Sequence, residues 1–182
     1  MKKKERWKNI GEFAILLAAV LVLAVFVRRF VLERVDIIGS SMEPTFYDND
    51  VVMVEKMSKR SKNPQRFDVI VFFPDEAAKK AGDVYYVKRV IGLPGETVQI
   101  HFGMVYINDE PLAAEYEKER IEDPGRAAEK IVLGEDEYFV LGDNRAVSKD
   151  SRSTEVGNVK RSQIGGRVVW QLLPIRECGP VK

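Results

Sequence analysis

The sequence predicts a mainly β domain behind one N-terminal transmembrane helix, and three observations predict it. Residues Phe13–Val27 contain no polar side chain. The rest of the chain consists of short runs rich in β-branched and aromatic residues, bounded by polar or turn residues, which is the pattern of strands. Hydrophobic residues make up 45% of the 182 positions, enough to bury a core.

The apolar segment is interpreted as an uncleaved membrane anchor. With Ile10 it covers roughly 22–27 Å as a helix, close to the about 30 Å of a bilayer core, and it spans if its ends snorkel. A cleavable signal peptide would be followed by a small-residue cleavage site, but Arg28 and Arg29 follow Val27. A buried helix of a soluble protein would usually keep a polar stripe, and this segment has none.

The charges around the anchor predict its orientation. Five basic residues precede it, and they outnumber Arg28, Arg29 and Arg34 after it. Positive charge stays in the cytoplasm, so the N-terminus is expected there. We therefore expect a single-pass protein of the cell membrane with three parts, a cytoplasmic basic tail (1–9), the anchor (10–30) and an extracytoplasmic β domain (31–182).

The β domain is predicted from hydrophobic runs along the chain. An apolar run at Val35–Ile38 reads as a strand that leads into a tight turn. Residues 112–130, dense in Glu, Lys, Arg and Ala, read as a short helix or a surface excursion, and residues 56–66 and 75–83 as loops. The further predicted strands are 50–55, 67–73, 84–91, a hairpin of 96–102 and 104–107 around Gly103, then 138–141 and 167–172.

The composition excludes several classes of function. Lys plus Arg (29) nearly cancels Asp plus Glu (28), so nothing indicates a nucleic-acid partner. Cys178 and His101 are the only residues of their types, so no disulfide framework or zinc site is expected, and each reads as an ordinary residue. We expect no metal and no cofactor. A serine nucleophile in this chain would have lysine as its base unless it used His101.

The stretch Gly39–Pro44 carries the candidate nucleophile, Ser41. Glycine permits a tight turn and Pro44 fixes the path of the chain just beyond it. Such a turn can hold one hydroxyl beside backbone N–H groups, as a nucleophile next to an oxyanion hole requires. The alternative is a plain Gly-Ser-Ser loop.

Two later stretches bear on this choice. In Tyr85–Ile91, neighbouring residues point to opposite faces of a strand, so either Lys88 or Arg89 faces inward if the strand is covered on both sides. The alternative is an edge strand with both charges in water. In Gly142–Arg152 a Gly-Asp-Asn turn precedes acids, arginines and hydroxyls, and the alternative is an Asx-type loop with surface ion pairs.

Together the three stretches resemble the signature boxes of type I signal peptidases. The matching residues are Ser41–Thr45, Lys88–Glu96 and Gly142–Arg152, in the expected order behind an anchor. The resemblance covers essentially the whole chain and is to the smaller form of Gram-positive bacteria. It implies a signal-peptidase/LexA-like β domain and an endopeptidase that removes signal peptides at Ala-x-Ala-type sites from exported preproteins through an acyl-enzyme. Its implied partners are secretory preprotein signal peptides and the lipid bilayer.

The resemblance also implies roles for single residues. Ser41 is the nucleophile and its backbone N–H belongs to the oxyanion hole. Lys88 is the general base, and Ser148 hydrogen-bonds its amine. Met42 walls the substrate cleft. Some branches of the family have a serine hydroxyl at the position of Gly39, so a second oxyanion donor is not apparent here.

Charged residues are implied to support the site. Asp143, Arg145, Asp150 and Arg152 hold the last box against the lysine strand, and Arg89 is the expected partner of Asp143.

The effect of burial on a lysine pKa independently favours Ser41 and Lys88 as nucleophile and base. A free lysine has a pKa of about 10.4, so only about one in 2500 is neutral at pH 7. Burial among Tyr86, Val90 and other apolar side chains can lower that pKa by about two to three units, at a cost of roughly 3 to 4 kcal/mol. Ser41 follows Val27 by 14 residues, which tethers it near the membrane surface.

Two alternatives share some of these features. A non-catalytic membrane-tethered β module that binds extended peptides leaves the pairing of Ser41 with Lys88 unexplained. A self-cleaving Ser/Lys protein of the repressor type requires an upstream DNA-binding domain, and residues Phe13–Val27 occupy that place.

Overall fold

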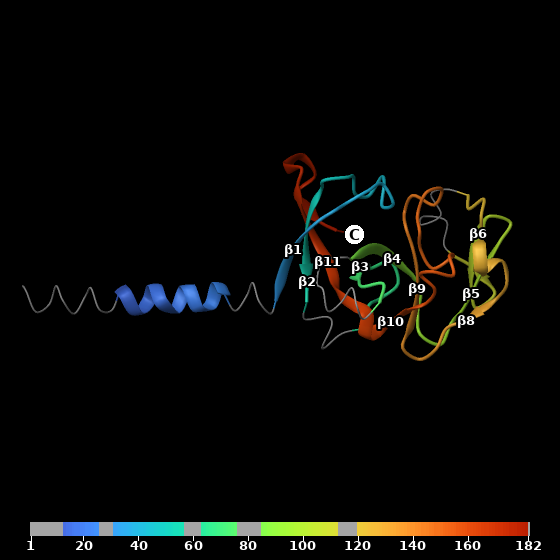
Figure 1. The fold of residues 1–182 in the computed structure, drawn as a ribbon, viewed down its shortest axis with the longest axis horizontal. Coiled ribbons are helices and arrows are strands. Elements are labelled where there is room, and N and C mark those ends of the chain that lie inside the picture. The colour runs from blue at the N-terminus through green and yellow to red at the C-terminus, as the bar shows by residue number, and fades with distance from the viewer. Residues whose placement is uncertain (1–12, 26–30, 57–62, 76–84, 113–119, 182) are drawn as a thin grey trace, which may run out of the picture.

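The chain is mainly β, as predicted. The computed structural model describes residues 13–25, 31–56, 63–75, 85–112 and 120–181 (Figure 1). Its strands are β1 (Leu32–Asp36), β2 (Val51–Glu55), β3 (Val69–Phe72), β4 (Tyr86–Gly92), β5 (Thr97–His101), β6 (Met104–Ile107), β7 (Glu110–Pro111), β8 (Ile131–Val132), β9 (Glu137–Leu141), β10 (Val159–Lys160), β11 (Ile164–Leu173) and β12 (Gly179–Pro180). Three short 3₁₀ helices are η2 (Gly125–Ala128), η3 (Arg161–Gln163) and η4 (Ile175–Glu177).

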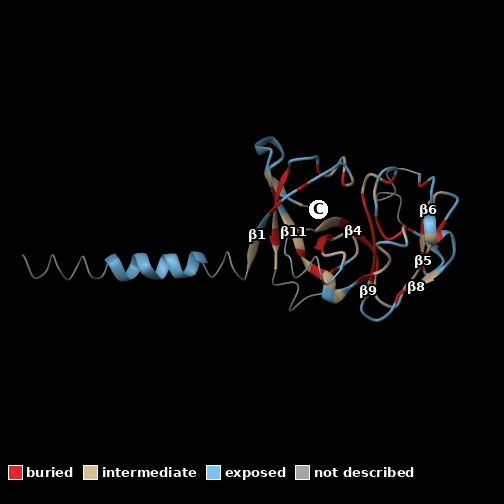
Figure 2. Cartoon of the chain, viewed as in Figure 1, coloured by how far each residue is buried: buried red, intermediate tan, exposed pale blue. Residues whose placement is uncertain are grey.

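The described part of the expected anchor is helical. Residues 13–25 form a helix with exposed apolar side chains (Figure 2). The remaining parts of the expected anchor and all of the expected basic tail lie outside the described residues. Among the described residues, no helix has the length and apolar character needed to cross a bilayer.

The strands form two antiparallel sheets. The larger has the order β1-β2-β11-β3-β4-β9-β10, and β12 pairs with β11. The smaller has the order β7-β6-β5-β8. Strand β4 therefore lies inside the larger sheet, with Lys88 opposite Ile70 of β3 and Arg89 opposite Leu141 of β9. This excludes the edge-strand alternative for Lys88 and Arg89.

The predicted hairpin of β5 and β6 is confirmed. Its two turn residues, Phe102 and Gly103, have φ angles of 51° and 79°. Asn108 and Asp109, between β6 and β7, also have positive φ, at 52° and 69°. Positive φ at both central residues is the geometry of the tight turns that match the twist of paired strands.

Strand β4 is covered by apolar side chains on both faces. Val90 packs with residues of β3 and β9, whereas Ile91 belongs to a second core built around the smaller sheet. A third core, which includes Val35 and Met42, lies between β1, β2 and β3. Because both faces are covered, Lys88 (4% exposed) and Arg89 (7% exposed) are both buried. The sequence predicts that only one of the two faces inward.

The structure corrects the predictions for residues 35–38 and 112–130. The strand expected at 35–38 is β1, which begins earlier and ends at Asp36. The described end of the segment 112–130 forms η2 and buries Ile121 and Ala127, so it belongs to the second core rather than to a surface excursion. Residues 113–119 lie outside the described residues, as do residues 57–62 of the predicted loop 56–66 and residues 76–83 of the predicted loop 75–83.

Candidate active site

The turn that carries Ser41 is fixed at both ends. Gly39 has a φ of +86°, a conformation that favours glycine, and its N–H donates to the Asp48 carboxylate at 2.7 Å. Beyond Ser41, the side chains of Met42 and Phe46 are each 1% exposed and pack into the core between β1, β2 and β3. The backbone at Ser41 is therefore held by a hydrogen bond before it and by burial after it.

Strand β4 brings Lys88 to this turn. Its Nζ lies 2.7 Å from the Ser41 Oγ and donates to the Val87 carbonyl at 2.9 Å. The amine also lies 5.9 Å from the centre of the Tyr86 ring. The predicted nucleophile and base are thus at hydrogen-bond distance, although 47 positions separate them in the chain.

Burial changes the protonation of this amine. Desolvation lowers the Lys88 pKa from 10.5 to about 8, while the charges of Asp150 and Asp143 act to raise it. At pH 7 about one molecule in eleven then has a neutral amine, which is far more than for a free lysine. The shift corresponds to about 3 kcal/mol of unfavourable burial of the charged form.

The Asp143 carboxylate is occupied by partners other than Lys88. Arg89 donates to its two oxygens through Nε at 2.8 Å and Nη2 at 2.6 Å, and the Thr45 hydroxyl donates at 2.5 Å. Burial raises the pKa of Asp143, but the hydrogen bonds and charge of Arg89 together with the Thr45 bond more than offset this and hold the pKa below its ordinary value. The predicted partnership of Arg89 and Asp143 is therefore present, and it ties the last box to the lysine strand.

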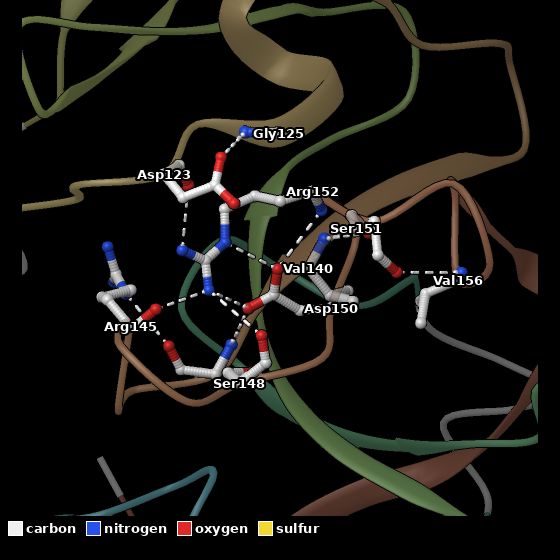
Figure 3. A network of polar contacts seen from close by, with 11 residues as sticks. Asp123, Gly125, Val140, Arg145, Ser148, Asp150, Ser151, Arg152 and Val156 are labelled. Atoms are coloured by element: carbon white, nitrogen blue, oxygen red, sulfur yellow. Dashed lines mark hydrogen bonds and ion pairs between the residues drawn. The ribbon is translucent and has the colours of Figure 1, made fainter.

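The Asp150 carboxylate is also occupied. It is 0% exposed and accepts from Arg152 Nε at 2.8 Å and Nη2 at 3.0 Å, and from the Gly142 N–H at 3.0 Å (Figure 3). Arg152 further donates to the carbonyl of Arg145 at 2.7 Å. Among the described residues, no carboxylate forms an ion pair with Lys88.

The other predicted site residues differ in their placement. Arg145, Asp150 and Arg152 bond to one another or to the backbone of the loop after β9, and Arg152 also donates to the Asp123 carbonyl at 3.3 Å. None of the hydrogen bonds of these three side chains goes to the lysine strand. The Ser148 hydroxyl is buried and has no hydrogen-bond partner within the described part of the chain, so its expected bond to Lys88 is not formed. Met42 lies in the core beneath the turn.

Two residues of the site were missed from the sequence. A Cβ at Gly142 would overlap the Ser148 hydroxyl and the Ser41 carbonyl oxygen, so glycine is required where the loop meets the turn. Thr45 joins the turn to Asp143, 98 positions away. Both stand in the quoted motifs, but only the sheet order shows what they contact.

The Ser41 N–H makes no hydrogen bond to any described residue and is available as an oxyanion donor. The Gly39 N–H is taken by Asp48, so it supplies no second donor. Within the described ranges, no cluster of His, Cys, Asp and Glu could hold a metal ion.

Known proteins resemble this chain over most of its length. The chain is 43% identical over 164 residues to a signal peptidase I of Leptolyngbya laminosa, covering 87% of this chain and 77% of that protein. It is 34% identical to signal peptidase I S of Bacillus subtilis, covering 93% and 92%. A solved signal peptidase I structure from Enterococcus faecalis, 36% identical, covers 58% of this chain and 97% of that one with a TM-score of 0.45. The family profile described as signal peptidase, peptidase S26, matches residues 10–173, and the chain therefore belongs to this family of serine endopeptidases.

Proposed function

We propose that the chain is a membrane-anchored endopeptidase that cleaves signal peptides from exported preproteins at Ala-x-Ala-type sites. The observation that carries the proposal is the 2.7 Å contact between the Ser41 Oγ and the amine of Lys88, whose burial lowers its pKa to about 8. The names of the relatives support the substrate class, since they are called signal peptidase I.

The first half of the reaction forms an acyl-enzyme. The neutral Lys88 amine takes the Ser41 hydroxyl proton while Oγ attacks the scissile carbonyl carbon, and the Ser41 N–H stabilises the resulting oxyanion. The oxyanion then collapses, the C–N bond breaks, and the Lys88 ammonium gives its proton to the leaving amine. The mature protein leaves, and the signal peptide remains as an ester on Ser41.

The second half restores the enzyme. Lys88, neutral again, takes a proton from water as that water attacks the ester carbonyl. Collapse of the second oxyanion returns the proton to the Ser41 oxygen and releases the signal peptide as a carboxylic acid. No metal or cofactor enters either half.

The proposed location follows from the apolar segment. Residues 10–30 are proposed to span the cell membrane with the N-terminus in the cytoplasm and the β domain outside. A signal peptide holds its own apolar segment in the same bilayer, which raises the effective concentration of its cleavage site at Ser41. The substrate is proposed to bind as an added strand, with small side chains in shallow apolar pockets.

The direct test is cleavage of a synthetic Ala-x-Ala peptide by the purified full chain in detergent. Ser41→Ala and Lys88→Ala should each lower kcat/KM by at least about 10³-fold, because each removes one member of a unit. Ser40→Ala and Lys149→Ala are the matched controls, since both residues are exposed and outside the pair. Near-full activity of either pair variant, folded by circular dichroism, would refute the proposal.

Ser148 has a separate test because its hydroxyl makes no bond to Lys88 in the free protein. If it orients the amine during the reaction, Ser148→Ala lowers kcat about 10-fold to 10²-fold and leaves KM nearly unchanged. An unchanged kcat removes Ser148 from the mechanism.

A further inference from the structure

A polar cavity lies beside the loop that follows β9, lined by residues of that loop and of the segment 120–125. Its volume is about 610 Å³, within the range of small-molecule sites. Its charged lining consists of Arg120, Glu122, Asp123, Arg145 and Arg152. Ser41 and Lys88 are not among the lining residues.

Arg145 is the unusual member of this lining. The residue is only 7% exposed, and its Nε donates to the Gly142 carbonyl at 3.0 Å. Its two terminal nitrogens, Nη1 and Nη2, donate to no described residue, and Figure 3 shows this end of the side chain apart from the bonded network. Nη1 and Nη2 keep contact with solvent, and as unused donors on a residue that lines the cavity they could both bind one oxyanion.

The other charges of the cavity are largely compensated. Arg152 is neutralised by Asp150. The Asp123 carboxylate accepts from the Gly125 N–H, and the Asp123 carbonyl accepts from Arg152 at 3.3 Å. Arg120 and Glu122 are exposed and of opposite sign. The charges of Asp143 and Asp150 attract the Arg145 guanidinium, but neither carboxylate accepts a hydrogen bond from its Nη1 or Nη2.

Hydroxyl groups add further donors to the same cavity. Ser153 and Thr154 also line it. The Ser153 oxygen accepts from the Val156 N–H, which leaves its own proton free to donate outward. An oxyanion with several acceptor oxygens suits such a set better than a neutral ligand does, and a guanidinium fork matches a phosphate in two parallel bonds.

We propose that this cavity binds a phosphate group through the Nη1 and Nη2 atoms of Arg145, with Ser153 and Thr154 as additional donors. The group is either free phosphate or the headgroup of an anionic phospholipid. Its binding fixes the loop 142–152, since the same Arg145 holds the Gly142 carbonyl through Nε. The lining includes neither Ser41 nor Lys88, so failure of the phosphate test would leave the proposed proteolytic mechanism untouched.

The test measures thermal unfolding of the full chain in neutral detergent at constant ionic strength. One arm titrates inorganic phosphate, and the other compares micelles that contain phosphatidylglycerol with micelles that contain phosphatidylcholine. In the arm with the true source, Tm of the wild type should rise saturably, by about 3–6 °C at ten times Kd. Arg176→Gln should behave as the wild type, because Arg176 is exposed and outside the cavity.

Variants of Arg145 separate this site from general salt effects, which act equally on every variant. Arg145→Gln should abolish the saturable rise, and Arg145→Lys, which keeps the charge but loses the fork, should weaken the apparent affinity about tenfold or more. Equal responses of Arg145→Gln and Arg176→Gln in both arms, or no saturable rise at all, would overturn the proposal.

A wild-type measurement decides the matter if Arg145→Gln does not fold. Crystals soaked with tungstate, an anomalous scatterer of phosphate-like shape, should show a peak at hydrogen-bond distance from Arg145 Nη1 or Nη2. A soak with no peak in this cavity would overturn the proposal.

Discussion

At the scale of single residues, the site depends on keeping Lys88 without a carboxylate partner. Asp143 and Asp150 both act to raise its pKa, yet each is hydrogen-bonded to an arginine instead. Desolvation therefore dominates, and the pKa falls to about 8. By binding these two carboxylates, Arg89 and Arg152 help keep the Lys88 pKa low without contacting Lys88.

The burial of this lysine should cost stability. Its folded pKa of about 8 lies below the ordinary 10.5, so between these values the unfolded chain binds a proton that the folded chain does not. Wild-type stability should accordingly rise as pH increases from 8 to 10.5. Lys88→Met, which fills similar space without a charge, should be more stable than the wild type at pH 7 by up to about 3 kcal/mol.

Urea unfolding of both proteins at pH 7 and pH 10 checks this. The difference between them should shrink at the higher pH, and taking that difference cancels the titration of groups they share. A Lys88→Met variant that is no more stable at pH 7 would contradict the assigned cost of burial.

Much of the site could be predicted from the sequence. Ser41, Lys88 and the partnership of Arg89 with Asp143 follow from the motifs and from the chemistry of a serine enzyme whose one histidine is His101. The bond from Thr45 to Asp143 could not be predicted, because a hydroxyl in a turn has many local acceptors and its actual partner depends on tertiary packing.

At the scale of elements, an interior strand and a loop build the site together. Strand β4 has apolar cores on both faces, and this is why two adjacent basic residues can both be buried. The loop after β9 meets the turn of Ser41 at Gly142, where the Asn144 N–H also donates to the Ser41 carbonyl at 3.2 Å.

Gly142→Ala tests this close approach. The added methyl group must displace the Ser148 hydroxyl or the Ser41 carbonyl, so kcat/KM should fall about 10²-fold or more because small misplacements at reacting groups are costly. Gly134→Ala is the matched control, since a Cβ there meets only the Glu137 side chain at 3.4 Å or more. The account of the loop is wrong if the two variants process the peptide equally well while both remain folded.

Strands could be predicted where a hydrophobic run was long enough to show its alternation. Strands β2, β3, β4, β5 and β6 fall within a few residues of their predicted bounds. Strands β7, β8, β10 and β12 have two residues each, too few for any alternation to appear in the sequence. Their pairing is determined by neighbouring strands instead.

At the scale of the whole molecule, sheet order brings the reacting groups together. The turn of Ser41 connects β1 to β2, and Lys88 lies on β4, with β11 and β3 between β2 and β4 in the larger sheet. The mainly β class could be predicted from strand-like runs. The crossing of β11 between β2 and β3 could not, because nothing local in residues 164–173 specifies which strands flank it.

We propose that Lys88 acts as a base because burial lowers the pKa of its amine to about 8, so that a usable fraction is neutral near physiological pH. The most direct measurement is NMR titration of the Lys88 side chain in the full chain carrying Ser41→Ala, assigned by comparison with Lys88→Arg, beside the pH dependence of wild-type kcat/KM. We expect a Lys88 pKa of about 8 and an acidic limb of kcat/KM in the same range, with activity rising as pH increases through it. A Lys88 that titrates near 10.5 would refute its assignment as the base.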